Sequence, residues 1–471
     1  MTFHAPDVLD RGRWWSGDEL DAMARGWRDA VVERFGESDR PIAAAMPASS
    51  EAVALFVALT SLPSPVILLS PDVRTWRTAP NIPVGTPITL LPGLAHLASE
   101  AERFGLVPFV LSKSRRPLRG APVTPLEGPG VVLFTSGSTA SPKPAFHSRS
   151  SLLGWVNSRH AALGLAAGAG ALTEASPAYG QGLNYLVGAI ALGGPLGFID
   201  RHDHRLALKA LAEPAFQCWR ASHHLADVLS RCVLTGPSTV PPIGIVTTPI
   251  SRAVFDAFRE RFGVPLRQAY SSTETGAVSL DNARPADVRP ETVGYPLPGV
   301  EIRIGEHLGE PRPIGELGRI WVRNPWQMVG YGFPPHLERP GAVGGWWPTC
   351  DLGMLQADGR LILAGRLDDA IRTRDNRVVN LAEVTTHLRG IPGVTDALVL
   401  PLDGRTGRSF GAVVECGPTI SANTLRLKLA ETLPPWSWPR ALELVSTLPR
   451  LPNGKPDRRE CGILLGEPPM T

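Results

Sequence analysis

The stretch VVLFTSGSTASPK, residues 131–143, joins an apolar, strand-like run to a loop of hydroxyl side chains that ends in a lysine. Backbone N–H groups, short hydroxyls and an ammonium are all hydrogen-bond donors, so such a loop can surround a polyphosphate. The loop is not of the Walker type, because the pattern G-x-x-x-x-G-K-[ST] is absent. Composition alone leaves a second interpretation open, which is an exposed turn rich in serine and threonine.

Lysine is rare in this chain, which makes its position in this loop informative. The 47 basic residues include only five lysines, which are Lys113, Lys143, Lys209, Lys428 and Lys455. A compact ammonium and a planar guanidinium are not interchangeable at a binding site. We therefore give weight to Lys143 and to Lys455, which also lies in a glycine-containing loop.

The sequence before the loop alternates strand-like and helical segments. Apolar residues at helical spacing run through residues 18–36 and stop at a glycine, as in a surface helix. The following segments indicate strand, helix, strand, helix and strand in turn: PIAAAM, SEAVALFVALTSL, PVILLS, AHLASEAERFG and VPFVLS. This rhythm predicts an α/β fold with largely parallel strands.

The predicted secondary structure changes toward the C-terminus. After about residue 290 short strands and turns predominate, and ADGRLIL, residues 357–363, predicts a hairpin around Asp358-Gly359. Beyond Arg366 two helical and two strand-like segments indicate a small α+β unit. We therefore predict a large N-terminal domain of several subdomains with mixed and parallel sheets (residues 1–366), and a small mobile α+β C-terminal domain (residues 367–471).

The composition favours an enzyme of the cytoplasm. Hydrophobic residues make up 43% of the chain, and the net charge of +3 is not arranged as a basic stripe, which argues against a nucleic-acid partner. The five cysteines form no C-x-x-C pair, which argues against a disulfide framework and a zinc site. Neither a signal pattern nor an apolar run of about 18 residues is present, so we expect no membrane span.

Four further motifs follow the loop in order. They are YSSTE (residues 270–274), WWPTCDLG (346–353), GRLDD (365–369) and LPRLPNGKPDR (448–458). An aromatic face, a hydroxyl and a carboxylate suit a nucleotide–metal complex. An ammonium stabilises negative charge that builds at a reacting phosphorus. Each motif alone also fits an ordinary loop or hairpin, but five in this order are not explained by chance.

Together with FTSGSTASPK, these motifs resemble those of the adenylate-forming superfamily, which includes acyl-CoA synthetases, aryl-acid and amino-acid adenylation domains and luciferases. The likeness runs from about residue 20 to residue 460. It implies an acid–thiol ligase. Such an enzyme uses ATP and Mg²⁺ to convert a carboxylic acid into an acyl-AMP and then passes the acyl group to a thiol.

The resemblance also assigns roles to residues of this chain. Tyr270 is expected to stack on adenine, whereas Asp351 and Arg366 are expected to hold the ribose. The full set expected to contact ATP is Thr135, Ser136, Gly137, Ser138, Thr139, Lys143, Tyr270, Ser271, Thr273, Asp351 and Arg366.

The same resemblance implies the residues that carry the chemistry. Lys455 is expected to bridge the carboxylate and the α-phosphate, with Lys143 and Glu274 as the other catalytic residues. Glu274 is also the expected ligand of Mg²⁺. Thr273 is expected to contact the α-phosphate, and Asp368 is expected to be the hinge about which the small domain swings.

Three residues depart from the pattern of the superfamily. Ala140 and Cys350 each stand where relatives have glycine, and Asp375 does so in the loop after the hinge. An alanine in a left-handed conformation costs about 1–2 kcal/mol, whereas aspartate tolerates that conformation better. The loop after the hinge serves thioester formation in relatives, so the second half-reaction is the less firmly supported one.

The resemblance places the acid pocket around Tyr179, Gly180, Gly182 and Thr248. Activators of α-amino acids place an aspartate in the first of these segments, but no acidic residue occurs from Ser176 to Ile190. A buried ammonium without a counter-charge is costly. We therefore predict a non-amino acid, either aryl or acyl, with the glycines leaving room for it.

We expect the thiol acceptor to come from a separate molecule, which is either coenzyme A or the phosphopantetheine arm of a carrier protein. Two other functions are also compatible with the sequence. In one of them, the enzyme forms the acyl-AMP and then either transfers the acyl group to an amine or retains the adenylate. In the other, the chain is a non-catalytic nucleotide-binding relative that acts as a partner subunit or sensor.

Overall fold

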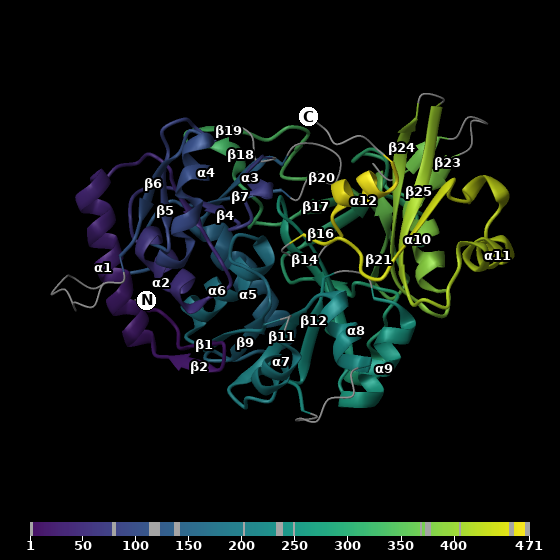
Figure 1. Cartoon of the computed structure of the whole chain (residues 1–471), viewed down its shortest axis with the longest axis horizontal. Helices are drawn as coiled ribbons and strands as arrows, with labels where there is room; N and C mark the ends of the chain where they lie inside the picture. Colours follow the sequence, from purple (N-terminus) through teal and green to yellow (C-terminus); the bar gives the residue numbers. More distant parts are fainter. Residues whose placement is uncertain are drawn as a thin grey trace.

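The computed structural model (Figure 1) describes residues 3–77, 82–112, 123–135, 142–200, 203–231, 239–247, 250–367, 370–372, 378–404, 407–451 and 456–466. Two large sheets and the helices around them form most of the N-terminal part. A smaller unit, formed by the C-terminal part of the chain, is drawn at the right of Figure 1. In the described part of the chain, no helix combines the length and the apolar character needed to cross a membrane.

The first large sheet contains the strand that leads into the serine- and threonine-rich loop. Its five neighbouring strands β7, β4, β3, β5 and β6 run parallel, and β8, β18 and β19 extend it antiparallel. In spatial order the strands are β19 (His336–Glu338), β18 (Gly330–Phe333), β8 (Pro144–Ser148), β7 (Gly130–Phe134), β4 (Val66–Leu69), β3 (Ile42–Ala45), β5 (Pro87–Leu90) and β6 (Val107–Val110).

The second large sheet has nine strands, most of them parallel. In spatial order they are β15 (Tyr295–Pro296), β14 (Gly276–Leu280), β13 (Leu266–Ser272), β12 (Ile243–Val246), β11 (Phe216–Ala221), β9 (Gly170–Thr173), β10 (Leu196–Phe198), β1 (Val8–Asp10) and β2 (Arg13–Trp15). A separate antiparallel sheet contains β16 (Glu301–Ile304), β17 (Gly318–Arg323), β20 (Trp347–Leu355) and β21 (Leu361–Arg366).

Helices fill the space between the large sheets and cover their outer faces. The largest core combines side chains of both sheets with four helices: α1 (Gly17–Phe35), α2 (Ser50–Thr60), α5 (Arg149–Leu163) and α6 (Gly180–Leu192). The outer face of the first sheet packs around α3 (Arg74–Arg77) and α4 (Ala98–Arg103). The outer face of the second packs on α7 (His204–Leu211), α8 (His223–Arg231) and α9 (Arg252–Phe262). The result is a layered α/β fold.

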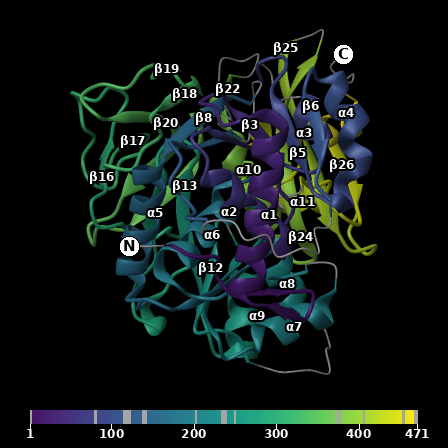
Figure 2. The same cartoon turned by 90° about the vertical axis from the view of Figure 1, so that its left-hand side faces the viewer.

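Helix α1 (Gly17–Phe35) shows how local sequence sets an element's limits. Ser16 and Glu19 form a capping box at its start, and Gly36 ends it with a φ of +75°. A capping box satisfies backbone N–H groups that the first turn leaves open, and glycine adopts positive φ without strain. Figure 2 shows α1 along the outside of the N-terminal part, next to α2.

The C-terminal unit has an apolar core of its own, made of residues from Ile371 onward. Its elements are β22 (Ala370–Arg372), β23 (Val378–Asn380), α10 (Leu381–Arg389), β24 (Val394–Gly404), β25 (Gly407–Cys416), α11 (Ala422–Thr432), β26 (Ala441–Val445) and α12 (Arg458–Leu464). The α/β class and the small α+β unit predicted from the sequence are confirmed. The exact boundary at residue 366 and the mobility of the unit stay predictions.

A tight contact between α5 and β14 yields a test of the packing. Gly276 has a φ of +70°, and a Cβ there would lie 1.5 Å from Nε1 of Trp155. Gly276→Ala should therefore lower the free energy of unfolding by about 2–5 kcal/mol, through both backbone strain and steric overlap.

Gly263 is the matched control for this substitution. Its φ is +69°, but no atom lies within 4 Å of the Cβ position. Gly263→Ala should cost only the backbone strain, about 1–2 kcal/mol. Urea unfolding of both variants measures the difference, and equal losses would contradict the close approach of Trp155 to Gly276.

Candidate active site

Three residues from different motifs meet at the end of the β20–β21 hairpin. Asp351 on β20 is the register partner of Arg366 on β21, and their Oδ1 and Nη1 atoms are 3.3 Å apart. Tyr270 on β13 donates a hydrogen bond of 2.5 Å from its hydroxyl to Oδ2 of the same carboxylate. The structure therefore brings together the three residues that the sequence assigned to the adenosine part of ATP. The hairpin predicted around Asp358-Gly359 is confirmed.

The environment of Tyr270 keeps its hydroxyl protonated. Its ring is buried among apolar residues that include Val278, Val293 and Ile320. Burial, with the Asp351 carboxylate beside it, raises the pKa of Tyr270 well above its ordinary value. A protonated phenol is a hydrogen-bond donor, so it orients Asp351 across the neutral pH range.

Thr349 supports the Asp351 carboxylate from the same strand. Its hydroxyl donates to the carbonyl of Ile320 at 2.7 Å and accepts the backbone N–H of Asp351 at 3.2 Å. Arg319 donates from Nε to the carbonyl of Thr349 at 2.7 Å. These bonds restrain the backbone on which Asp351 lies.

A second cluster lies around Glu274, in the turn between β13 and β14. The hydroxyl of Tyr331, on β18, donates to Oε1 of Glu274 at 2.7 Å. Nζ of Lys143 lies 5.2 Å from the centre of the Tyr331 ring, within the range of a cation–π contact. Tyr331 thus joins the lysine of the serine- and threonine-rich loop to the expected magnesium ligand, and sequence reasoning did not identify it.

The ends of the serine- and threonine-rich loop are bonded to each other. Thr135 donates its backbone N–H to the carbonyl of Lys143 at 3.0 Å, and its hydroxyl accepts the N–H of Lys143 at 2.9 Å. Ser271, exposed on β13, and Thr273, half-buried in the turn that carries Glu274, lie in the same region of the chain. Several predicted residues lie outside the described residues, so their roles stay predictions: Ser136, Gly137, Ser138, Thr139, Thr248, Asp368 and Lys455.

Glu274 supplies the carboxylate that is expected to bind Mg²⁺. Among the residues that the structure describes, no group of three or more His, Cys, Asp or Glu side chains could hold a metal ion. Mg²⁺ keeps several waters and is often bound through one or two carboxylates and substrate phosphates. Glu274 therefore fits a magnesium that arrives with a nucleotide.

The predicted acid pocket begins at the N-terminus of α6. Tyr179 is the N-cap residue, and a Cβ on Gly180 would make ordinary contacts with the Trp155 ring at 3.6 Å. A Cβ on Gly182 would lie 2.2 Å from the carbonyl oxygen of Ser176. Glycine at position 182 is therefore required by the preceding turn, and its expected part in the acid pocket stays a prediction.

Trp155 connects this end of α6 to the Glu274 turn. It donates from Nε1 to the carbonyl of Trp326 at 3.1 Å and lies against Gly276. The buried ring of His147 is 4.8 Å from the Trp155 ring, and burial lowers the pKa of His147 to about 4. Sequence reasoning did not identify Trp155, because a tryptophan at helical spacing also fits an ordinary core position.

The two flanks of residues 452–455 are held together. Arg450 and Pro456 form an antiparallel bridge, and the N–H of Asp457 donates to the carbonyl of Pro449 at 2.8 Å. Nη2 of Arg450 binds two buried carboxylates, Asp396 at 2.7 Å and Glu415 at 3.1 Å. Arg450 therefore anchors the segment that contains Lys455 to the body of the C-terminal unit.

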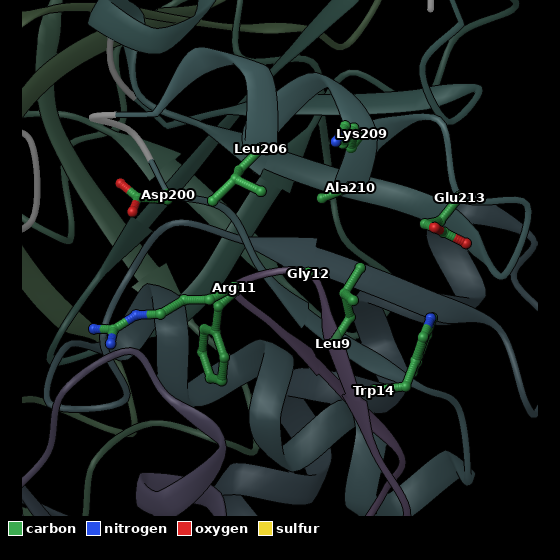
Figure 3. Close-up of a pocket in the computed structure, with 10 residues that line it drawn as sticks. Leu9, Arg11, Gly12, Trp14, Asp200, Leu206, Lys209, Ala210 and Glu213 are labelled. Carbon is green, nitrogen blue, oxygen red and sulfur yellow. The ribbon is translucent and has the colours of Figure 1, made fainter.

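A cavity of about 110 Å³ lies elsewhere, between the β1–β2 hairpin and α7 (Figure 3). Its walls include Leu9, Arg11, Trp14, Leu206 and Lys209. The lining residues come from the β1–β2 hairpin at one edge of the second sheet and from α7, whereas the predicted site residues that the structure describes come from other elements. The cavity is therefore separate from the candidate active site.

Comparison with known proteins gives the family. A family model described as AMP-binding enzyme matches residues 89–332, more than half of the chain. The chain belongs to the AMP-binding enzyme family. The resemblance to the adenylate-forming superfamily is thereby confirmed.

Relatives of the chain share about a quarter of its residues. Novobiocin biosynthesis protein H of Streptomyces niveus is 26% identical, over 96% of this chain and 79% of the relative. Fatty acid–[acyl-carrier-protein] ligase ScoC of Streptomyces coeruleorubidus is 28% identical, over 72% of this chain and 67% of the relative. The solved amide bond synthetase McbA from Marinactinospora thermotolerans superposes with a TM-score of 0.79 at 24% identity, covering 98% and 97% of the two chains.

The bonds to Asp351 predict its effect on nucleotide binding. Asp351→Asn removes a charged acceptor from the expected ribose site and leaves Arg366 without its carboxylate. Loss of a charge-assisted hydrogen bond costs about 1.5–3 kcal/mol, so the affinity for Mg·ATP should fall about 10- to 100-fold. Calorimetric titration measures this. Asp358→Asn, in the exposed hairpin turn, should leave the affinity unchanged, and an unchanged affinity in Asp351→Asn would contradict the assignment.

Proposed function

We propose that this protein activates a non-amino carboxylic acid with ATP and transfers the acyl group to a thiol. The carboxylate oxygen attacks the α-phosphorus, and pyrophosphate leaves. The thiol sulfur then attacks the carbonyl carbon of the acyl-AMP, AMP leaves, and the thiol gives up its proton. The acceptor thiol belongs to coenzyme A or to a phosphopantetheinylated carrier protein.

One observation carries this proposal: Tyr270 and Arg366 both contact the carboxylate of Asp351. These residues come from three separate motifs, and 81 positions separate Tyr270 from Asp351. Glu274, in the turn that follows β13, forms a cluster with Tyr331 on β18 and Lys143 before β8, and this cluster supplies groups for phosphates and Mg²⁺. The arrangement supports binding of a nucleotide along the carboxyl ends of the strands, where ligands bind in α/β sheets.

The contacts of Glu174 support a non-amino acid as the substrate. This carboxylate, just upstream of the pocket segment, accepts the backbone N–H of Ser222 and lies 3.8 Å from Nη1 of Arg220. Its charge is balanced by Arg220, so it does not supply the counter-charge that an α-ammonium would need. Within the described residues, positions 176–190 contribute no acidic side chain.

Two candidate functions differ in the molecule that accepts the acyl group. The name of the relative ScoC specifies an acyl-carrier-protein acceptor, whereas that of McbA specifies amide bond formation. AMP release that depends on coenzyme A or a phosphopantetheinylated carrier supports the proposal. AMP release that depends on an amine instead would favour an amide synthetase.

Acid-dependent ATP–pyrophosphate exchange tests the first half-reaction. We expect exchange with aryl or acyl acids and not with α-amino acids, and a loss of at least about 100-fold in Lys455→Ala, because a charge donor at a reacting phosphate contributes roughly 3 kcal/mol. Lys428→Ala, on the exposed face of α11, is the matched control and should retain full exchange. ATP binding without exchange for any acid would favour a non-catalytic nucleotide-binding protein.

Because Arg450 anchors the segment that contains Lys455, its replacement should change the rate of ATP–pyrophosphate exchange. Arg450→Met should lower the kcat of exchange by about tenfold or more while changing the KM for ATP less than about threefold, because it displaces a group that acts in the transition state. Arg450→Lys should recover part of the kcat, because a single ammonium still reaches the carboxylates. A parallel rise in KM without loss of kcat would contradict a positioning role.

A further inference from the structure

Two buried arginines lie in the polar layer between α6 and the second sheet. Arg220 on β11 is 1% exposed, and Arg159 on α5 is 7% exposed. Arginines are seldom this deeply buried unless a counter-charge and hydrogen-bond acceptors surround them.

Arg220 has one close hydrogen-bond acceptor. Its Nη2 donates to the hydroxyl of Thr247 at 3.0 Å, and the same hydroxyl accepts a bond of 2.5 Å from Nε2 of Gln181. Its Nη1 lies 3.8 Å from Glu174, too far for a hydrogen bond. Within the described part of the chain, its Nε and Nη1 atoms are buried and make no hydrogen bond.

Arg159 contacts an aromatic ring in place of a carboxylate. Its guanidinium lies 4.2 Å from the centre of the Tyr185 ring. None of its three guanidinium nitrogens makes a hydrogen bond to the residues that the structure describes, and the same holds for the Tyr185 hydroxyl. A buried donor that lacks an acceptor costs about 1–3 kcal/mol, and more when it is charged.

The charges of this layer do not balance. The layer contains two guanidinium groups, those of Arg159 and Arg220, and a guanidinium is a charged group in proteins. Burial lowers the pKa of Arg220, and the nearby Glu174 carboxylate opposes that change. Glu174 balances only one of them. Burial raises the pKa of Cys218 to about 11 and raises that of Tyr185 further, so neither supplies a negative charge. Among the described residues, the layer carries one positive charge in excess.

This layer continues directly from the predicted acid pocket. Gln181, Tyr185 and Gly188 lie at helical spacing on one face of α6, which starts at Tyr179. Gln181 reaches Thr247 and hence Arg220, while Gly188 and Tyr185 lie next to Arg159. The guanidinium groups of the two arginines therefore lie beside α6, on the C-terminal side of Gly180.

We propose that the acid substrate carries a second carboxylate, which Arg220 and Arg159 bind at the inner end of the pocket. This inference rests on the proposed function. The two guanidiniums and the Tyr185 hydroxyl supply donors for both carboxylate oxygens. The carboxylate restores the balance of charge. The substrate is therefore an aliphatic or aromatic dicarboxylic acid, of which one carboxylate is adenylated.

The test compares matched acids on the unmodified protein. Each dicarboxylic acid is paired with the monocarboxylic acid in which a methyl group replaces the second carboxylate, over a series of aliphatic chain lengths and for benzene dicarboxylic acids. We expect kcat/KM for ATP–pyrophosphate exchange to be at least about tenfold higher for one or more dicarboxylic acids than for their neutral partners. Equal or better exchange with every neutral partner would overturn the subsite alone. Exchange with no acid would overturn the proposed function as well.

Substitutions test whether Arg159 and Arg220 cause the preference for dicarboxylic acids. Arg159→Met should bring the ratio between the dicarboxylic acid and its neutral partner toward one. Arg220→Met is combined with Glu174→Gln, because removal of one member of a buried pair leaves an uncompensated charge. Arg205→Met, an exposed arginine on α7, is the matched control and should keep the ratio. A thermal unfolding midpoint confirms that each variant is folded, and an unchanged ratio in folded Arg159→Met and the double variant would overturn the assignment.

Discussion

The hydrogen bond between Tyr270 and Asp351 is the interaction on which the account of this protein depends. It connects the second large sheet to the β20–β21 hairpin, and through Arg366 it reaches the last residue before the C-terminal unit. A phenol kept protonated by burial and a carboxylate held between two donors form a fixed site. A rigid acceptor of this kind loses little entropy when it binds two vicinal hydroxyls.

The layered fold places the chemical groups around this bond. Helices α2, α5 and α6 share one core between the two sheets, so the N-terminus of α6 and the Glu274 turn are both held by Trp155. Tyr331 on β18 links Glu274 to Lys143 across strands that are far apart in sequence. The residues predicted to bind the nucleotide and the acid are therefore positioned by the same packed layer.

Much of this architecture could be predicted from the sequence, because the signals are local. Short apolar runs that alternate with helical segments predicted the parallel strands and helices, and Asp358-Gly359 predicted the hairpin that carries Asp351. The contributions of Tyr331, Trp155 and Arg450 could not be predicted in this way. Their roles depend on contacts between distant segments, and each residue alone fits an ordinary core or surface position.

The charge layer beneath α6 illustrates the same limit. The absence of acidic residues from 176 to 190 was visible in the sequence and predicted a non-amino acid. That Glu174 is paired, and that Arg159 and Arg220 face the same helix, depends on how β9, β11 and α5 come together. The structure therefore supports a proposal about what the substrate carries, whereas the sequence supported only an exclusion.

Transfer of isotope from the acid to the nucleotide tests the central claim most directly. The protein is given ATP and a carboxylic acid labelled with ¹⁸O in its carboxylate, together with the acceptor, and the products are analysed by mass spectrometry. If the carboxylate attacks the α-phosphorus, each AMP released carries one ¹⁸O atom from the acid. AMP without label, or ADP together with labelled phosphate, would contradict an acyl-AMP intermediate.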